Sequence, residues 1–126
     1  MSVRSDQEYL RAVLRAPVYE VAEKTPLELM PNVSKRLDNT VLVKREDRQA
    51  VHSFKIRGAY NRMRNLTEEE RRAGVVTASA GNHAQGVALS SARLAVKAKI
   101  VMPRPTPTIK VDAVRQLGGE VVLAGA

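Results

Sequence analysis

The sequence contains no cysteine and no tryptophan, and its only aromatic residues are three tyrosines and one phenylalanine. The absence of cysteine excludes disulfide scaffolds, thiolate zinc sites, iron–sulfur clusters and cysteine nucleophiles, and it is typical of a reducing compartment. No apolar run approaches the roughly 20 residues that a membrane-spanning helix needs, and the N-terminus lacks the apolar stretch of a signal peptide. We therefore expect a cytoplasmic protein with no membrane partner.

Positive charge is in excess, since 21 Lys and Arg against 13 Asp and Glu give a formal net charge of +8. Such a balance favours acidic partners, of which nucleic acid is the first to consider. The basic residues are nevertheless scattered, and the few aromatic residues offer little for bases to stack on. We therefore expect no nucleic-acid partner, and keep nucleic-acid binding as an alternative that a steep dependence of affinity on salt would reveal.

The C-terminal half alternates strictly between strand and helix patterns. These predict strands over 75–77, 98–102 and 120–123 and helices over 82–94 and 108–117. Short connections between such elements are typical of right-handed crossovers onto a parallel sheet. We expect an α/β fold in which flanking helices cover both faces of a parallel sheet, and residues 1–126 to form a single unit.

The N-terminal half has weaker patterns. Apolar residues at helical spacing predict a helix over 5–14, a second over 32–37 entered through Pro31, and a third from Ser53 to about Asn65. Thr67 and Glu70 are spaced as a capping box for a further short helix that Gly74 ends. Residues 25–27 should be extended, and the apolar, β-branched run over 40–44 predicts a buried strand.

Two loops carry residues that could perform chemistry. In the first, residues 53–59, Lys55 falls in the opening turn of a helix. The helix dipole and partial burial would both disfavour its ammonium form, and an uncharged lysine amine can form a Schiff base with an aldehyde. The alternative is an ordinary solvated lysine at a helix start.

The second loop, residues 77–83, lies between a strand end and a helix. Gly81 permits close approach of a ligand, while Ser79 and the free N–H groups of the helix could hold a carboxylate or phosphate. Asn82 could donate a hydrogen bond to an oxygen anion. The alternative is that Ser79 and Asn82 cap the helix, which such residues do more often than they take part in catalysis, and that His83 is a packing residue. No histidines or carboxylates are spaced as metal ligands.

Together the two loops resemble those of the pyridoxal-phosphate enzymes of fold type II, the tryptophan synthase β-like family. The matching segments are Ser-Phe-Lys-Ile-Arg-Gly-Ala at 53–59 and Ser-Ala-Gly-Asn-His at 79–83. Within that family, residues 43–47, 75–86 and 100–103 look like those of the biosynthetic threonine dehydratases. The resemblance extends from Tyr9 to Gly125.

The resemblance implies pyridoxal 5'-phosphate as the cofactor and Lys55 as the residue that holds it covalently. Phe54 would pack beside the cofactor ring, and Asn82 would donate a hydrogen bond to its phenolate oxygen. The amino-acid carboxylate would be bound at the helix N-terminus by Ser79, Ala80, Gly81, Asn82 and His83. The implied reaction converts L-threonine, or L-serine, to a 2-oxo acid and ammonia, as in the first step of isoleucine biosynthesis.

The family's glycine-rich phosphate loop and its regulatory region have no counterpart among these 126 residues. We therefore expect the N-terminal part of a catalytic domain, with weak cofactor binding unless chains pair to complete the site. A final strand with an exposed edge also favours self-association into a homo-oligomer. The same residues are compatible with a serine racemase or with a catalytically silent interaction module.

Overall fold

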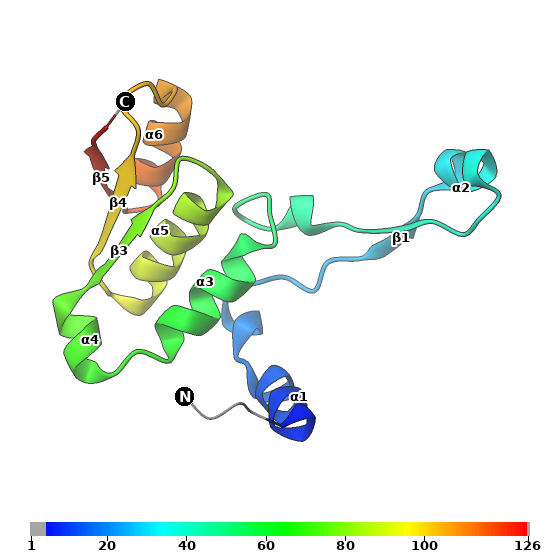
Figure 1. The fold of residues 1–126 in the computed structure, drawn as a ribbon, viewed down its shortest axis with the longest axis horizontal. Helices are drawn as coiled ribbons and strands as arrows, with labels where there is room; N and C mark the ends of the chain where they lie inside the picture. The colour runs from blue at the N-terminus through cyan, green and yellow to red at the C-terminus, as the bar shows by residue number, and fades with distance from the viewer. Residues whose placement is uncertain (1–4, 126) are drawn as a thin grey trace.

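The structure, a computed structural model, describes residues 5–125 and is organised around a three-stranded parallel sheet (Figure 1). Its strands, in spatial order, are β3 (Val75–Ala78), β4 (Ala98–Met102) and β5 (Glu120–Leu123). The connections are helices α5 (Asn82–Leu94) and α6 (Thr108–Gln116). The predicted α/β class, with a parallel sheet and flanking helices, is confirmed.

Within residues 5–125, helices cover only one face of this sheet, so the expectation that both faces are covered is wrong. Ile100 is completely buried on the inner face, whereas Val76 on the outer face is 72% exposed. Lys99 and Glu120, paired in register on the outer face, are exposed as well. The reason is topological: successive right-handed crossovers that advance in one direction place every helix on the same side.

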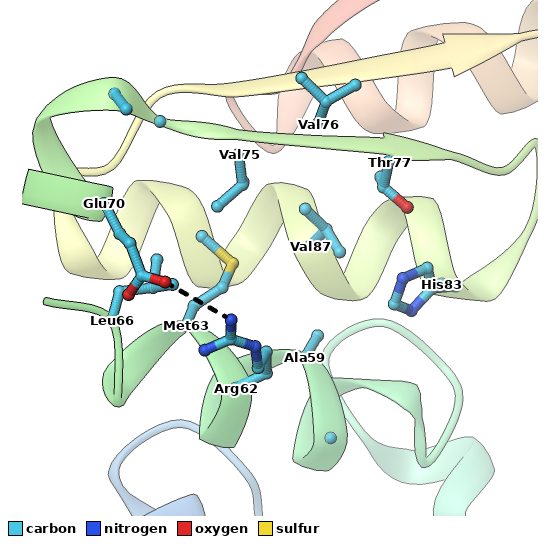
Figure 2. A pocket seen from close by; sticks show the side chains of 13 residues that line it. Ala59, Arg62, Met63, Leu66, Glu70, Val75, Val76, Thr77, His83 and Val87 are labelled. Atoms are coloured by element: carbon cyan, nitrogen blue, oxygen red, sulfur yellow. Dashed lines mark ion pairs between the residues drawn. The ribbon is translucent and has the colours of Figure 1, made fainter. Parts of the chain in front are cut away.

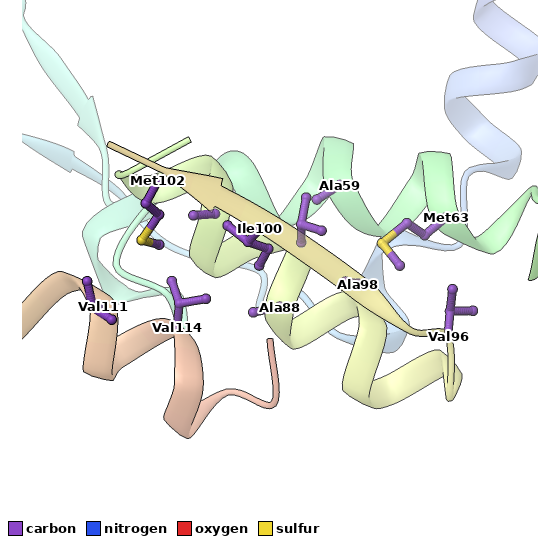
Figure 3. Packing of buried hydrophobic residues seen from close by; sticks show 11 residues of the cluster. Ala59, Met63, Ala88, Val96, Ala98, Ile100, Met102, Val111 and Val114 are labelled. Atoms are coloured by element: carbon purple, nitrogen blue, oxygen red, sulfur yellow. The ribbon is translucent and has the colours of Figure 1, made fainter. Parts of the chain in front are cut away.

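The hydrophobic core lies between the inner face of the sheet and helices α3 (Lys55–Arg64), α5 and α6 (Figure 3). Ile100 and Met102 of β4 form its centre and are completely buried. The apolar faces of α3 and α5 are buried, as helical spacing predicts, and they consist of Ile56, Ala59, Tyr60, Met63, Ala84, Val87, Ala88 and Ser91. The sheet and α3 thereby hold α5 from opposite sides.

Helix α4 (Glu68–Ala73) joins α3 to the sheet and has the predicted capping box. The Thr67 hydroxyl accepts a hydrogen bond from the Glu70 N–H at 3.2 Å, and the Glu70 carboxylate accepts one from the Thr67 N–H at 2.8 Å. The helix ends at Gly74, whose φ of 82° lies in the left-handed region that favours glycine. This turn delivers the chain directly into β3.

Residues 26–45 form an arm that extends away from the sheet (Figure 1). It contains the antiparallel pair β1 (Leu27–Leu29) and β2 (Leu42–Lys44), joined by α2 (Pro31–Leu37). The extended segment and the helix entered through Pro31 are confirmed. The strand predicted over 40–44 is confirmed as β2, but its predicted burial is wrong: Leu42 is 50% exposed, because β2 pairs only with the short β1 and lies outside the parallel sheet.

The first helix, α1 (Asp6–Arg15), has a capping box between Ser5 and Glu8 and is followed by a 3-10 turn, η1 (Val18–Glu20). Its predicted apolar face is exposed, with fractions from 56% at Tyr9 to 76% at Leu14. A second 3-10 turn, η2 (Glu46–Arg48), lies between the arm and α3. None of the helices within residues 5–125 has the length and apolar character required to cross a bilayer.

Candidate functional site

The loop between β3 and α5 leaves the start of α5 open. Gly81 precedes the helix, and no side chain caps it, so the interpretation of Ser79 or Asn82 as a helix cap is wrong. The Ser79 hydroxyl instead accepts a hydrogen bond from the Gly81 N–H at 3.3 Å, and the Ser79 N–H donates to the Val101 carbonyl at 3.0 Å. The first-turn N–H groups of a helix lack intrahelical acceptors and attract anions.

Lys55 is the first residue of α3, as predicted, and its side chain is exposed. The partial burial expected for its amine is therefore wrong. The Lys55 Nζ lies 5.2 Å from the centroid of the Phe54 ring, close enough for a cation–π contact. No carboxylate among residues 5–125 forms an ion pair with this amine, so nothing acidic there competes for it.

The two loops are brought together by a glycine that sequence reasoning missed. A β-carbon at Gly86 would lie 3.2 Å from both the carbonyl carbon and the oxygen of Lys55. Asn82 is one helical turn before Gly86 and therefore lies on the same side of α5. The backbone of Lys55 consequently rests on the first turns of the helix that begins with Asn82. The available signal was a glycine inside a helical pattern, which often marks close packing.

A small cavity of about 300 Å³ lies at the carboxyl ends of the strands. It is lined by Ala78, Ser79, Ala80, Val101, Met102, Pro103 and Ala124. Ligands of open α/β sheets bind at this edge. Ser79 and Ala80, two residues of the predicted binding loop, therefore line a cavity at this edge of the sheet.

His83 faces a different space. A larger cavity of about 430 Å³ opens beside the free edge of β3, between α3, α4 and α5 (Figure 2). His83 and Thr77 line one end of it, and the Arg62–Glu70 ion pair, 3.8 Å long, lies toward the other. The His83 side chain is exposed, so it is not a packing residue. Different residues of the predicted loop thus line different cavities, and Gly81 and Asn82 line neither of these two.

The titratable residues of the described chain do not form a metal centre. Within residues 5–125, no group of three or more His, Asp or Glu side chains is arranged to hold a metal ion. The Asp47 carboxylate forms an ion pair with Arg45 at 2.7 Å. The Arg45 guanidinium holds the pKa of the Asp47 carboxyl below its ordinary value of 3.8.

The amino-acid sequence of the chain matches a known protein family. The model of the family described as "Pyridoxal-phosphate dependent enzyme" matches residues 18–126. The chain is 72% identical over 119 residues to the biosynthetic L-threonine dehydratase IlvA of Escherichia coli, covering 94% of this chain and 23% of that protein. The chain therefore spans about a quarter of the length of that relative.

Solved structures agree with the sequence comparison. The processed form of threonine deaminase isoform 2 from Solanum lycopersicum superimposes with a TM-score of 0.91 and 58% identity, over 99% of this chain and 35% of that one. Maize serine racemase superimposes with a TM-score of 0.87 and 32% identity, over 99% of this chain and 37% of that one. With a family model that matches most of its residues, this chain belongs to the pyridoxal-phosphate dependent enzymes.

Proposed function

We propose that this chain is the N-terminal part of a pyridoxal-phosphate dependent L-threonine ammonia-lyase, which converts L-threonine to 2-oxobutanoate and ammonia and also accepts L-serine. The observation that carries the proposal is the packing of the Lys55 backbone against Gly86 of α5, in a chain 72% identical to a biosynthetic threonine dehydratase. The same step would begin isoleucine biosynthesis.

The residues present fit the cofactor and an amino acid. Lys55 provides an exposed primary amine with no ion-pair partner among the described residues, as capture of an aldehyde requires. A β-carbon added at Gly81 would meet nothing within 4 Å, so the uncapped start of α5 has open space in front of it. A carboxylate there would accept hydrogen bonds from the free N–H groups.

The proposed roles follow from these positions. Lys55 would hold the cofactor and, once released, take the proton from Cα of the substrate. Residues 79–83 would bind the substrate carboxylate, and the Asn82 amide would donate to the phenolate oxygen of the cofactor. Phe54 would pack beside the ring. When bound, pyridoxal phosphate supplies an electron sink for the negative charge that develops at Cα.

Reductive trapping tests the proposal. The purified chain is incubated with pyridoxal phosphate, reduced with borohydride and digested, and the modified lysine is identified by mass spectrometry. We expect the pyridoxyl group on Lys55 and its loss in Lys55→Ala, whereas Lys97→Ala, an exposed lysine far from both loops in sequence, leaves it in place. Modification elsewhere, or none at saturating cofactor, would overturn the proposal and leave a catalytically silent module.

Serine racemization is the second candidate, favoured by the superposition on maize serine racemase. Two assays separate the candidates. An ammonia-lyase forms 2-oxobutanoate from L-threonine, whereas a racemase forms D-serine from L-serine. Formation of D-serine without any 2-oxo acid would assign the second function.

A cytoplasmic location and self-association are also part of the proposal. β5 lies at the edge of the described sheet, and its Val122 and Leu123 are 38% and 41% exposed. Such edges recruit partner strands. Sedimentation velocity over a range of concentrations measures the association, and a constant monomer mass would contradict it.

A further inference from the structure

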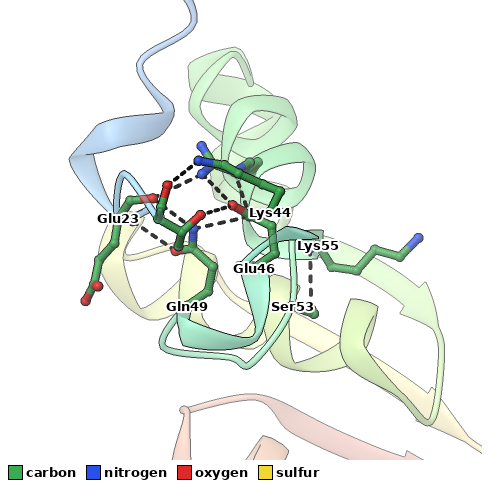
Figure 4. A network of polar contacts seen from close by, with 8 residues as sticks. Glu23, Lys44, Glu46, Gln49, Ser53 and Lys55 are labelled. Carbon is green, nitrogen blue, oxygen red and sulfur yellow. Dashed lines mark hydrogen bonds and ion pairs between the residues drawn. The ribbon is translucent and has the colours of Figure 1, made fainter. Parts of the chain in front are cut away.

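A cluster of polar side chains lies behind the start of α3, on the opposite side from the exposed amine of Lys55 (Figure 4). Its centre is the Glu46 carboxylate, which accepts hydrogen bonds from Arg57 Nε at 2.8 Å and Arg57 Nη2 at 2.9 Å. The Thr25 hydroxyl donates to the same carboxylate at 2.6 Å, and the Gln49 amide donates to it at 3.2 Å. The Arg57 guanidinium thus meets both carboxylate oxygens in a two-point pair, the geometry that makes such pairs strong.

This cluster is more enclosed than the other ion pairs of the described residues. The side chains of Glu46 and Arg57 are 15% and 23% exposed, and Gln49 is buried. The Arg57 hydrogen bonds hold the pKa of Glu46 at about 2, well below its ordinary value of 4.5. Glu46 is therefore charged throughout the range in which an enzyme of this family would work.

The cluster joins three separate segments of the chain. Gln49 binds the backbone of Glu23 at both ends of its amide, accepting from the N–H and donating to the carbonyl at 2.9 Å each. Arg57 donates to the same Glu23 carbonyl at 3.0 Å. The segment before the arm, the turn η2 and the first turn of α3 are consequently fixed to one another.

Arg57 is only two residues beyond Lys55, within the same helical turn. The loop that leads into α3 contains His52 in the left-handed region, with φ of 52°, so its conformation needs support from its surroundings. Gly86 supports the Lys55 backbone from the side of α5. The Glu46–Arg57 pair supports it from the side of η2.

We propose that Glu46 is a positioning residue that fixes the first turn of α3 through Arg57 and so sets the place from which the Lys55 amine captures an aldehyde. The inference rests on the proposed function, because it assigns Lys55 that role. Glu46 does not touch the reacting atoms. It acts through the backbone between Arg57 and Lys55.

The arm offers a matched control. The Glu28 carboxylate also pairs with two arginines, Arg45 at 2.6 Å and Arg48 at 2.7 Å. None of these three residues belongs to α3, and the Glu28 side chain is 36% exposed. Glu28→Gln therefore removes a carboxylate with the same kind of partner without touching the first turn of α3.

The test compares Glu46→Gln, Arg57→Lys and Glu28→Gln by two measurements on the same chain. The first is the selectivity of reductive trapping, defined as the amount of pyridoxyl modification on Lys55 divided by the amount on exposed lysines such as Lys97 and Lys110. The second is amide hydrogen exchange in the cofactor-free chain, read for a peptide over 53–60 and for one over 98–102. Circular dichroism confirms that each variant is folded.

We expect Glu46→Gln and Arg57→Lys to lower the selectivity for Lys55 about fivefold or more and to speed exchange over 53–60, because each loses the two-point pair. Exchange over 98–102 should not change, and Glu28→Gln should keep the selectivity of the unmodified chain. Glu46→Asp, which retains the charge, should restore part of the selectivity. A merely structural role would speed exchange without changing the ratio between lysines.

The experiment distinguishes failure of the positioning role of Glu46 from failure of the proposed function. Unchanged selectivity in Glu46→Gln, with or without faster exchange, in a chain that traps the cofactor on Lys55, would overturn the positioning role alone. If the unmodified chain does not trap the cofactor on Lys55, the proposed function fails. The exchange measurement then tests separately whether Glu46 orders the first turn of α3: faster exchange over 53–60 in Glu46→Gln supports this claim, and unchanged exchange contradicts it.

Discussion

Gly86 of α5 lies directly against the backbone of Lys55: a β-carbon at position 86 would come within 3.2 Å of the Lys55 carbonyl carbon and oxygen. The atoms that such a β-carbon would meet belong to the Lys55 backbone, which cannot rotate away as a flexible side chain could. The place of Lys55 in space is therefore set by a residue 31 positions later in the chain.

We expect Gly86→Ala to displace the start of α3 and to reduce trapping of pyridoxal phosphate on Lys55. Gly58, inside α3, provides the control, because a β-carbon there would meet nothing within 4 Å. Alanine should stabilise that helix by about 0.5 to 1 kcal/mol through its higher helix propensity. Urea unfolding should show this gain in Gly58→Ala and not in Gly86→Ala. An equal gain in both, with trapping unchanged, would contradict the packing argument.

Gly81→Ala should weaken substrate binding while leaving the fold intact. The added methyl group meets no atom of the chain within 4 Å, so the free energy of unfolding should change by no more than about 0.5 kcal/mol. The same methyl group would occupy the open space before α5, where we propose that the amino-acid carboxylate binds. Titration of L-threonine, followed by the absorption of the bound cofactor, measures the loss. Unaltered affinity would place the carboxylate elsewhere.

Ile100→Ala should destabilise the chain by about 3 kcal/mol, since it opens a cavity at the centre of the core. Ile100 is completely buried, whereas Val76, on the uncovered face of the same sheet, is 72% exposed. Val76→Ala should therefore change the free energy of unfolding by only about 0.5 kcal/mol. Urea denaturation of both variants measures the difference. A large cost at Val76 would show that another surface covers that face in solution.

The pH dependence of stability should report the Glu46–Arg57 pair. The pKa of Glu46 is depressed from 4.5 to about 2 in the folded chain, so its stabilising contribution is present above pH 4.5 and is lost as the pH falls toward 2. That contribution is at most about 3 kcal/mol. The free energy of unfolding of the unmodified chain minus that of Glu46→Gln should shrink over this interval. A difference that does not vary with pH would mean that the charge of Glu46 contributes nothing.

Much of the fold could be predicted because the decisive signals are local. Alternating strand and helix patterns predicted β3, α5, β4, α6 and β5, and the spacing of Thr67 and Glu70 predicted the cap of α4. The burial of β2 was predicted wrongly, because an apolar, β-branched run does not say which neighbour the strand will find. The uncovered sheet face was missed for a related reason: alternation of elements does not show the spatial order of the strands, and that order decides on which side each right-handed crossover passes.

The candidate site divides in the same way. The sequence by itself determined that a lysine opens one helix and that a glycine precedes another, since glycines, capping residues and helical periodicity act within a few residues of the chain. Only the tertiary structure decided that Gly86 meets the Lys55 backbone and that Glu46 meets Arg57, because those contacts join segments whose approach depends on packing across the molecule. Local conformational preferences decide where each helix begins, whereas packing between segments decides which residues of different segments come into contact.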